Sequence, residues 1–369
     1  MDARRPGGLH ALLAGQARDF AAWPVRGERF ADEIACLAAV LLAIAAARAI
    51  GIGNVGWAAF SAYMVIRPGL AETLYRGGSR VAGTAVGVLC ACLLAPVVAH
   101  SAAWTGVALA LFGGTCVYLA LLDRRTYGAL FAGMAFAMVI IDGMARPDEA
   151  LDALARARLL DVCVGCGAAL LVGAVSAMTV QRRPAAVPGE VQGRVQEARR
   201  RPAPRLWHRA AGMHALQAAI ALALIPWVWT AFHIQSLSQS STTILAVMMV
   251  PLLDATASRY PAARKLKHRF VGCAMGALLA TAVLVASHAA PIVMLLGVCL
   301  GILAGRHIEN GALDIGYVGT QFALAFLVVL VPEGDAAVDV HAGLARLSGI
   351  VVGMGLLLPA RLLVQRRAE

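Results

Sequence analysis

The chain has 369 residues, of which 60% are hydrophobic and 14% charged, and its mean hydropathy of +0.74 is that of a membrane protein rather than of a soluble domain. The net charge of +11 would suit a nucleic-acid-binding protein, but no nucleic-acid-binding motif accompanies it. Apolar runs of roughly 15 to 20 residues recur along the chain, which is the length that spans hydrocarbon as a helix. The sequence therefore predicts membrane-spanning helices and no nucleic-acid partner.

The apolar runs define an all-α, polytopic membrane protein with about twelve transmembrane helices. In chain order, the expected spans cover residues 33–52, 54–68, 82–100, 103–122, 127–143, 158–180, 213–231, 240–254, 271–288, 290–306, 314–332 and 344–364. Outside the spans, residues 1–32 form an N-terminal segment, 181–209 a linker rich in arginine and proline, and 365–369 a tail.

The positions of the cations predict the orientation, because Lys and Arg near helix ends are retained on the cytoplasmic side. With the N-terminus inside, all but five of the 32 Lys and Arg residues lie on that face. The exceptions are Arg48, Arg146, Arg156, Arg158 and Arg346. Both termini are therefore expected in the cytoplasm, and the basic linker is expected to be extended and to touch anionic lipid headgroups.

An internal repeat divides the apolar part of the chain into two halves. The stretch RVAGTAVG, residues 80–87, returns as RFVGCAMG at residues 269–276, and RLLDVCVGCG at 158–167 returns as RLSGIVVGMG at 346–355. Because each half holds an even number of spans, the second half enters the membrane from the same side as the first. The prediction is two parallel six-helix repeats, 33–180 and 210–364, with a pathway between them.

Glycines one helical turn apart mark close helix packing in both repeats. Gly83 with Gly87, and Gly272 with Gly276, would let another helix backbone approach closely. We interpret these four residues as packing positions.

The second and eighth spans are short and are broken by proline, at Pro68 and Pro251. Interrupted helices at matching positions of two repeats leave backbone groups free for a substrate. A pair of short helices buried in the bundle is the alternative interpretation.

Five arginines at span ends suit an anionic solute. Arg67, Arg80 and Arg269 lie at inner ends of spans, and Arg158 and Arg346 lie at the outer ends of the sixth and twelfth. Charges in a membrane usually face a cavity or a partner, although each of these long side chains could instead reach the interface. The matching of Arg80 with Arg269 and of Arg158 with Arg346 across the repeat favours substrate binding.

The second span contains three aromatic residues at three-residue spacing. Trp57, Phe60 and Tyr63 are expected on one face of that helix. They could line a pocket for an aromatic acid, or form part of an interfacial belt. We favour the pocket.

Two aspartates are candidates for proton coupling. Asp161 lies one turn from Arg158, and Asp254 follows Pro251 in the interrupted eighth span. A carboxyl group in a partly desolvated cavity can bind a proton near neutral pH, although either aspartate could be only an ion-pair partner.

The sequence lacks the common motifs for catalysis and for nucleotide binding. It contains no phosphate-binding GxxxxGK[ST], no HExxH and no GxSxG, so neither an enzyme nor an ATP-driven pump is expected. Cys163 and Cys166 form a CxxC, but no second Cys or His pair at zinc spacing accompanies them, so we expect no metal and no cofactor.

The stretch GWAAFSAYMVIRPGLAETLYRGGSRVAGTAVGVLCACLL resembles the fusaric acid resistance and aromatic acid exporter family. The resemblance rests on its Trp, the proline after the second span, and R-x-x-G-T-x-x-G opening the third span. The second half keeps Arg269, Gly272 and Gly276 but has Cys273 in place of the threonine. The fold is also similar to that of the plant aluminium-activated malate transporters.

The resemblance implies an exporter of aromatic carboxylic acids or related organic anions in the bacterial inner membrane, driven by the proton gradient. It names a periplasmic adaptor protein as a candidate partner, besides the anion and the lipid bilayer. A passive anion channel and a membrane scaffold without transport are the alternatives. The sequence leaves the substrate and the oligomeric state open.

Overall fold

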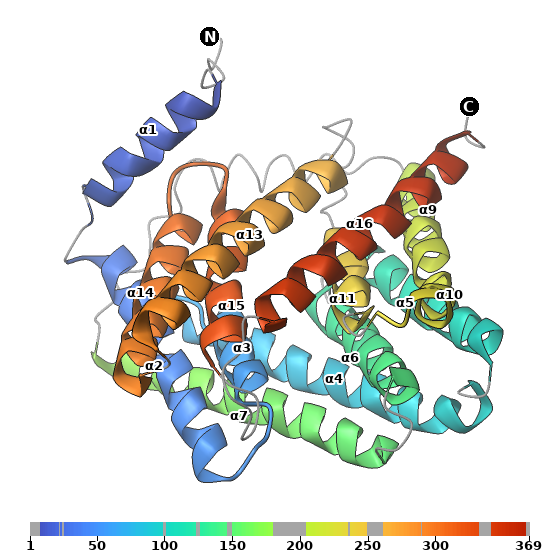
Figure 1. Cartoon of the computed structure of the whole chain (residues 1–369), viewed down its shortest axis with the longest axis horizontal. Coiled ribbons are helices and arrows are strands. Elements are labelled where there is room, and N and C mark those ends of the chain that lie inside the picture. The colour runs from blue at the N-terminus through green and yellow to red at the C-terminus, as the bar shows by residue number, and fades with distance from the viewer. Residues whose placement is uncertain are drawn as a thin grey trace.

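The computed structural model describes residues 8–21, 23, 26–98, 101–122, 126–145, 150–179, 204–234, 237–248, 261–288, 290–331 and 341–366. These residues form α-helices joined by turns and short loops, and no strand occurs among them (Figure 1). The helices of the first sequence half are α1 (Gly8–Ala21), α2 (Glu28–Ala49), α3 (Val55–Val65), α4 (Leu70–Val98), α5 (Ala102–Leu122), α6 (Thr126–Ala145) and α7 (Leu151–Thr179).

The second sequence half begins with α9, which starts inside the predicted linker. Its helices are α9 (Pro204–Ala223), α10 (Ile225–Phe232), α11 (Leu237–Met248), α13 (Pro261–Ser287), α14 (Pro291–Glu309), α15 (Gly316–Leu330) and α16 (His341–Arg366). Each of the twelve expected spans overlaps one of these helices, and the seventh overlaps both α9 and α10.

Among the described residues, eight segments are long and apolar enough to cross a membrane. They are Glu28–Ala49, Leu70–Val98, Ala102–Leu122, Tyr127–Ala145, Leu151–Thr179, Trp207–Phe232, Ala262–Ser287 and Pro291–Glu309. Three shorter apolar helices accompany them, at Val55–Val65, Gly316–Leu330 and Leu344–Ala360. The expectation of a multi-pass, all-helical membrane protein is thereby confirmed, while the count of twelve crossings stays a prediction.

Helices α4 and α7 begin well before the spans expected from the sequence. Their first turns carry exposed ion pairs between residues four apart, Glu72 with Arg76 at 2.8 Å and Asp152 with Arg156 at 2.9 Å. Such pairs favour helix formation in water. An apolar run in the sequence marks only the part of a helix that lies in hydrocarbon. The expected spans therefore begin after these charged turns.

Proline accounts for two of the breaks in the helical chain. A proline has no N–H to donate to the preceding turn and crowds the residue before it. Helix α3 ends at Val65, ahead of the exposed Pro68, and the chain breaks at Leu224 before Pro226 opens α10. Pro251, the predicted break in the eighth span, lies outside the described residues.

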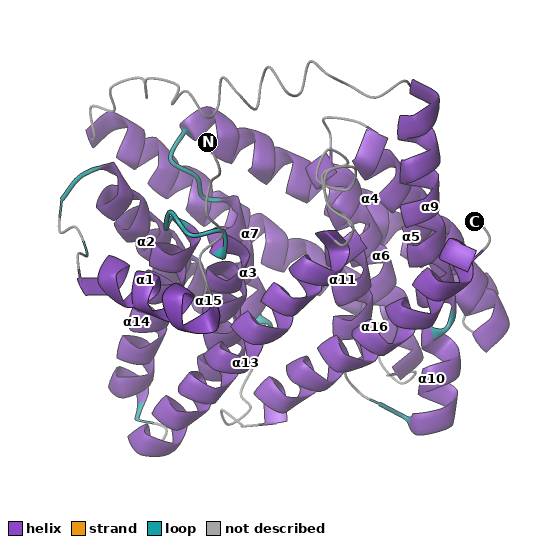
Figure 2. Ribbon diagram, turned by 90° about the horizontal axis from the view of Figure 1, so that it is seen from above, coloured by secondary structure: helices purple, strands orange, loops and turns teal. Residues whose placement is uncertain are grey.

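The buried apolar side chains form two cores, and each core mixes helices from both sequence halves. The first core is built mainly from α2, α3 and α7 together with α13, α14 and α15. The second core is built mainly from α4, α5 and α6 together with α9, α10, α11 and α16. Figure 2 shows the same grouping from above. The two sequence halves are therefore interlocked and do not form separate bodies.

The close backbone contacts of one half recur in the other. A Cβ added to Gly83 would overlap the carbonyl oxygen of Gly128, and one added to Gly272 would overlap that of Val318. The contact is therefore between α4 and α6 in the first half and between α13 and α15 in the second. All four glycines that the sequence marks as packing positions, including Gly87 and Gly276, lie at these two contacts.

Replacing Gly87 by alanine should test whether this contact controls stability. The new methyl group would overlap the carbonyl oxygen of Ala132, and overpacking of this kind costs about 1–3 kcal/mol. Gly167→Ala is the control, because nothing lies within 4 Å of its added Cβ, and alanine in a helix is favoured over glycine by up to about 1 kcal/mol. Thermal unfolding in detergent, followed by circular dichroism, should show Gly87→Ala below and Gly167→Ala at or above the wild type. Equal midpoints for the two variants would contradict the contact.

Candidate functional site

Arg80 lies on α4 and reaches across to the first core. Its side chain is 2% exposed, and its Nη2 donates to Ser61 Oγ on α3 at 3.1 Å. The guanidinium lies 3.8 Å from the centre of the Phe131 ring and 5.4 Å from that of Phe60. Among the described residues, Nε and Nη1 have no hydrogen-bond acceptor and no carboxylate is within 4.0 Å. The site therefore offers unused donors next to two aromatic rings.

Arg269 occupies the matching position on α13 and reaches across to the second core. It is 3% exposed, and its Nε donates to Thr243 Oγ1 on α11 at 3.1 Å. Its Nη1 contacts the Tyr317 hydroxyl at 3.3 Å and Gln321 Oε1 at 3.0 Å. In the described part of the chain, its Nη2 has no acceptor and no carboxylate pairs with it. Arg269 thus repeats the environment of Arg80 with a hydroxyl from the opposite core.

The two arginines define the chemistry of the boundary between the cores. A buried charge without an opposite charge costs several kcal/mol, so buried guanidinium groups are normally paired with carboxylates. Here the described hydrogen-bond and ring partners of Arg80 and Arg269 are hydroxyl, amide and aromatic groups, which partly solvate a cation without neutralising it. An anionic ligand would complete both environments.

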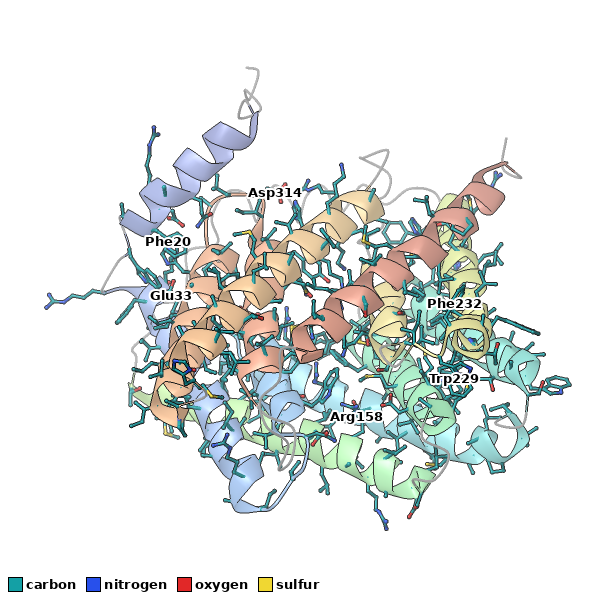
Figure 3. All side chains as sticks on the ribbon, viewed as in Figure 1. Phe20, Glu33, Arg158, Trp229, Phe232 and Asp314 are labelled. Atoms are coloured by element: carbon teal, nitrogen blue, oxygen red, sulfur yellow. The ribbon has the colours of Figure 1, made fainter. Side chains whose placement is uncertain are left out.

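Arg158, on α7, packs against the aromatic side chains of α3. Its guanidinium lies 4.3 Å from the centre of the Trp57 ring, and Trp57 is 5.2 Å from Phe60, centre to centre. Two carboxylates accompany it, Asp142 at 3.8 Å and Asp161 at 4.0 Å. Figure 3 shows Arg158 near the start of α7, away from Glu33. Trp57 and Phe60 therefore connect Arg158 to Arg80.

Three further predicted site residues are Arg346, Asp161 and Asp254. Arg346 on α16 is 3% exposed, and its Nε has no acceptor among the described residues. Asp161 is fully buried within ion-pair distance of Arg158, which supports the ion-pair interpretation, and its proton-coupling role stays a prediction. Asp254 lies outside the described residues.

Tyr63 and Arg67 are not brought to Arg80. The Tyr63 hydroxyl donates to Glu309 Oε2 at 2.8 Å, and Arg67 Nη1 lies 3.5 Å from Glu309 Oε1. With 3.6 residues per turn, Trp57 and Tyr63 differ by about 120° around the axis of α3. Three-residue spacing therefore turns the last aromatic of the series toward a different neighbour, α14.

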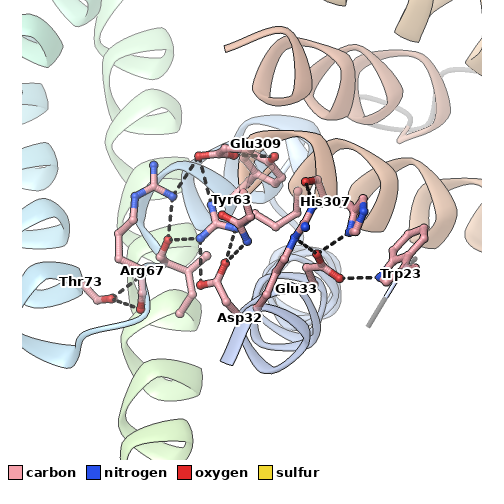
Figure 4. Close-up of polar contacts among 12 residues, drawn as sticks. Trp23, Asp32, Glu33, Tyr63, Arg67, Thr73, His307 and Glu309 are labelled. Atoms are coloured by element: carbon pink, nitrogen blue, oxygen red, sulfur yellow. Dashed lines mark hydrogen bonds and ion pairs between the residues drawn. The ribbon is translucent and has the colours of Figure 1, made fainter. Parts of the chain in front are cut away.

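A buried set of charges between α2 and α14 was not anticipated from the sequence (Figure 4). Arg306 forms a two-bond ion pair with Asp32, Nε to Oδ2 at 2.8 Å and Nη2 to Oδ1 at 3.0 Å. Its Nη1 also lies 3.3 Å from Glu309, and Asn310 donates to Asp32 at 2.8 Å. Arg306 and Asp32 are both nearly inaccessible, so this pair is shielded from water.

The same set extends to α1 through His307. His307 Nδ1 lies 2.9 Å from Glu33 Oε1, and both side chains are fully buried. Trp23 donates to Glu33 Oε2 at 2.8 Å and stacks on the His307 ring at 4.3 Å. Arg29 donates to the His307 carbonyl at 2.7 Å and holds Asp19 with two hydrogen bonds of 3.0 and 2.8 Å.

We call this set the α2–α14 network, which comprises Asp19, Trp23, Arg29, Asp32, Glu33, Tyr63, Arg67, Arg306, His307, Glu309 and Asn310. Its outermost ion pair joins Asp19 on α1 to Arg29 on α2, and the hydrogen bonds from Arg29 lower the pKa of Asp19. A lowered pKa in the folded state means that this contact stabilises α1 above pH about 4 and that the stabilisation is lost as the pH falls further.

Sequence reasoning missed the network because each member looks like an ordinary interfacial charge. Asp32 and Glu33 lie at the start of the first expected span, and Arg306, His307 and Glu309 lie at or just after the end of the tenth. In the sequence, 274 positions separate Asp32 from Arg306 and Glu33 from His307. The repeat gives no help, because the position of Arg306 corresponds to Tyr118 in the first half, which pairs with His208 at 3.0 Å on the surface. Within the described residues, no group of three or more His, Cys, Asp or Glu could hold a metal ion.

The helices and the buried arginines define a multi-pass helical membrane protein with charged sites inside its bundle. Residues 35–202 match the model of the fusaric acid resistance protein family (FUSC), so the resemblance is confirmed over a stretch that includes most of α2 and all of α3 to α7. Members of this family are membrane transporters rather than enzymes, and the match is consistent with transport or efflux. Neither the curated proteins nor the solved structures gave a match, and the similarity to the malate transporters stays a prediction.

Breaking the Asp32–Arg306 pair should destabilise the fold strongly. Removing one partner of a buried ion pair leaves the other charge uncompensated, which costs about 3–5 kcal/mol. Arg306→Gln and Asp32→Asn should each lower the unfolding midpoint in detergent, and the double variant should lose less than the sum of the two. Arg156→Gln breaks an exposed pair, worth at most about 1 kcal/mol, and serves as the control. Additive losses would show that the pair is not coupled.

Proposed function

We propose that this protein exports aromatic carboxylic acids or related organic anions across the bacterial inner membrane, driven by the proton gradient. The observation that carries the proposal is the matched burial of Arg80 and Arg269, each donating to a hydroxyl of the opposite core and neither paired with a described carboxylate. Cations held in this way are suited to bind an anion that arrives and leaves, because a resident carboxylate would compete with it.

The anion pathway in this proposal runs along the boundary between the two cores. The twelve predicted spans would form two parallel six-helix repeats, and the matched contacts of α4 with α6 and of α13 with α15 support that arrangement. A pseudo-two-fold axis along the membrane normal would then pass between Arg80 and Arg269. At this boundary, α4 of the second core packs against α7 of the first, and α16 of the second core packs against α13 of the first. Relative movement within these two pairs would open the boundary.

The aromatic part of the substrate is assigned to the face of α3. Phe60 and Phe131 both lie within 5.4 Å of the Arg80 guanidinium, and Arg158 lies over the Trp57 ring, so a carboxylate bound to Arg80 would have rings within reach of its own aromatic group. Arg158 and Arg346 are proposed to guide anions at the outer end. Arg67 and Tyr63 are left to the α2–α14 network, since both contact Glu309.

The orientation in the proposal has both termini in the cytoplasm. It rests on the distribution of Lys and Arg, and the described ends of the chain, α1 and the last turns of α16, lie at the same edge of the molecule in Figure 1. Asp161 and Asp254 remain the sequence-based candidates for proton coupling. A periplasmic adaptor protein remains a candidate partner.

Replacing the two buried arginines should reduce anion transport without unfolding the protein. Each charge-assisted hydrogen bond to a substrate carboxylate is worth about 1.5–3 kcal/mol, which corresponds to roughly 10- to 100-fold in affinity. Arg80→Gln and Arg269→Gln should each raise the half-saturating concentration of a labelled aromatic carboxylate by at least that lower factor in proteoliposomes with an imposed pH gradient.

Arg156→Gln is the matched control, because this arginine lies on α7 with an exposed partner and outside the proposed pathway. Its half-saturating concentration should equal that of the wild type. Flux that follows only the anion's own gradient in the wild type would replace the exporter by a passive channel. The absence of flux for any aromatic carboxylate tested would leave a membrane scaffold without transport.

A further inference from the structure

The α2–α14 network is a direct polar connection between the two sequence halves. Helices α1, α2 and α3 contribute most of its first-half members, with Trp23 and Arg67 in the connections after α1 and α3, and α14 contributes Arg306, His307 and Glu309. Its central side chains are buried, Glu33 and His307 completely. A network of this size inside a membrane protein costs more desolvation than an apolar contact would, which points to a functional reason for its charges.

The charges of the network balance only when one proton is added. Four carboxylates face three guanidinium groups, namely Asp19, Asp32, Glu33 and Glu309 against Arg29, Arg67 and Arg306. With a neutral His307, the network carries one net negative charge. With a protonated His307, the charges are equal, and all of these groups lie within 4.0 Å of an opposite charge.

His307 is surrounded by groups that favour a positive charge at that place. From α2, Glu33 Oε1 lies 2.9 Å from Nδ1, and from α1, Asp19 Oδ2 lies 3.5 Å from Nε2. The Asp19 carbonyl also lies 3.4 Å from Nε2, and the Trp23 ring covers the imidazole face. Arg29 opposes the charge, but its guanidinium is shared with Asp19 and Glu33, and it donates to the backbone of His307.

We propose that His307, held between Glu33 and Asp19, is the proton-binding site that couples the gradient to anion transport. The proton enters from water and binds an imidazole nitrogen, and no other covalent bond forms or breaks. When α14 stays against α2, the two carboxylates hold the proton. When α14 moves away from α1 and α2, His307 loses both carboxylates and releases the proton to the side that is then open. This inference rests on the proposed export of anions and assigns its coupling site.

The corresponding contact in the second core lacks such a set of charges among its described residues. There, α5 packs on α9 in the arrangement that corresponds to α14 on α2. A Cβ at Gly106 would lie 2.7 Å from the Ala223 carbonyl oxygen, so the two backbones are in close contact. The polar pair at this contact, Tyr118 and His208, is exposed and has no carboxylate among the described residues. Of these two corresponding contacts, in the described part of the chain, α2–α14 is the one that combines burial with an unbalanced charge.

The test separates coupling from transport in proteoliposomes. Counterflow of a labelled aromatic carboxylate at equal pH on both sides needs only binding and movement, whereas accumulation under a pH gradient also needs proton coupling. The key variant is Glu33→Gln combined with His307→Gln, which removes one carboxylate and the titratable base together, so three carboxylates face three guanidinium groups without any proton. This balanced variant is chosen so that folding is retained, which the thermal midpoint in detergent checks.

We expect the balanced variant to keep counterflow within about twofold of the wild type and to lose at least tenfold of the gradient-driven accumulation. His208→Gln is the matched control and should keep both activities. Asp161→Asn is the competing variant: loss of accumulation there, with full accumulation in the balanced variant, would overturn the inference.

The remaining outcomes are equally informative. Loss of counterflow together with accumulation in a folded balanced variant would make the network structural and would overturn the inference. Wild-type counterflow without any accumulation under a pH gradient would overturn coupling and leave anion transport standing. No counterflow in the wild type would overturn the proposed function itself, and the coupling site with it.

Discussion

The structure depends on the backbone contact of α4 with α6 and its counterpart of α13 with α15. At Gly83 and Gly272 there is no room for even a methyl group, because a carbonyl of the neighbouring helix occupies it. Helices that approach so closely leave no side-chain layer between them, so their relative position is defined within narrow limits. Arg80 and Arg269 each lie one turn before such a glycine, and the contact therefore places their guanidinium groups at the boundary of the two cores.

The two cores are alike in plan and unlike in charge. Each joins the first, second and sixth spans of one half to the third, fourth and fifth spans of the other, with α10 as an addition in the second core. At one outer contact, α5 lies against α9 through glycine, which favours a permanent association. At the other, α14 meets α2 through ion pairs, whose strength depends on water access and on protonation. A movement of α14 away from α2 would therefore respond to protonation and to water access, whereas α5 and α9 stay in close backbone contact.

Much of the helical pattern could be predicted from the sequence, because hydrocarbon imposes a simple requirement on length and polarity. The equivalence of Arg80 and Arg269 could also be predicted, since it depends on short-range spacing within one helix. The exchange of helices between the halves could not, because apolar faces of similar composition fit many partners. The pairs of Asp32 with Arg306 and of Glu33 with His307 were hidden for a related reason: each joins residues 274 positions apart, and no local pattern encodes that separation.

The two charged sites differ in the way their charges are satisfied, and this difference gives the proposed cycle its order. At the boundary of the cores, the described groups leave two cations without opposite charge, so the resting site favours an incoming anion. In the α2–α14 network, the carboxylates outnumber the guanidinium groups by one, so the joined state favours an incoming proton. Each ligand neutralises a charge that would otherwise be buried, and each would be released when water reaches its site. Coupled transport then requires that opening of the boundary between the cores also changes the α2–α14 contact, so that binding at one site alters the affinity at the other.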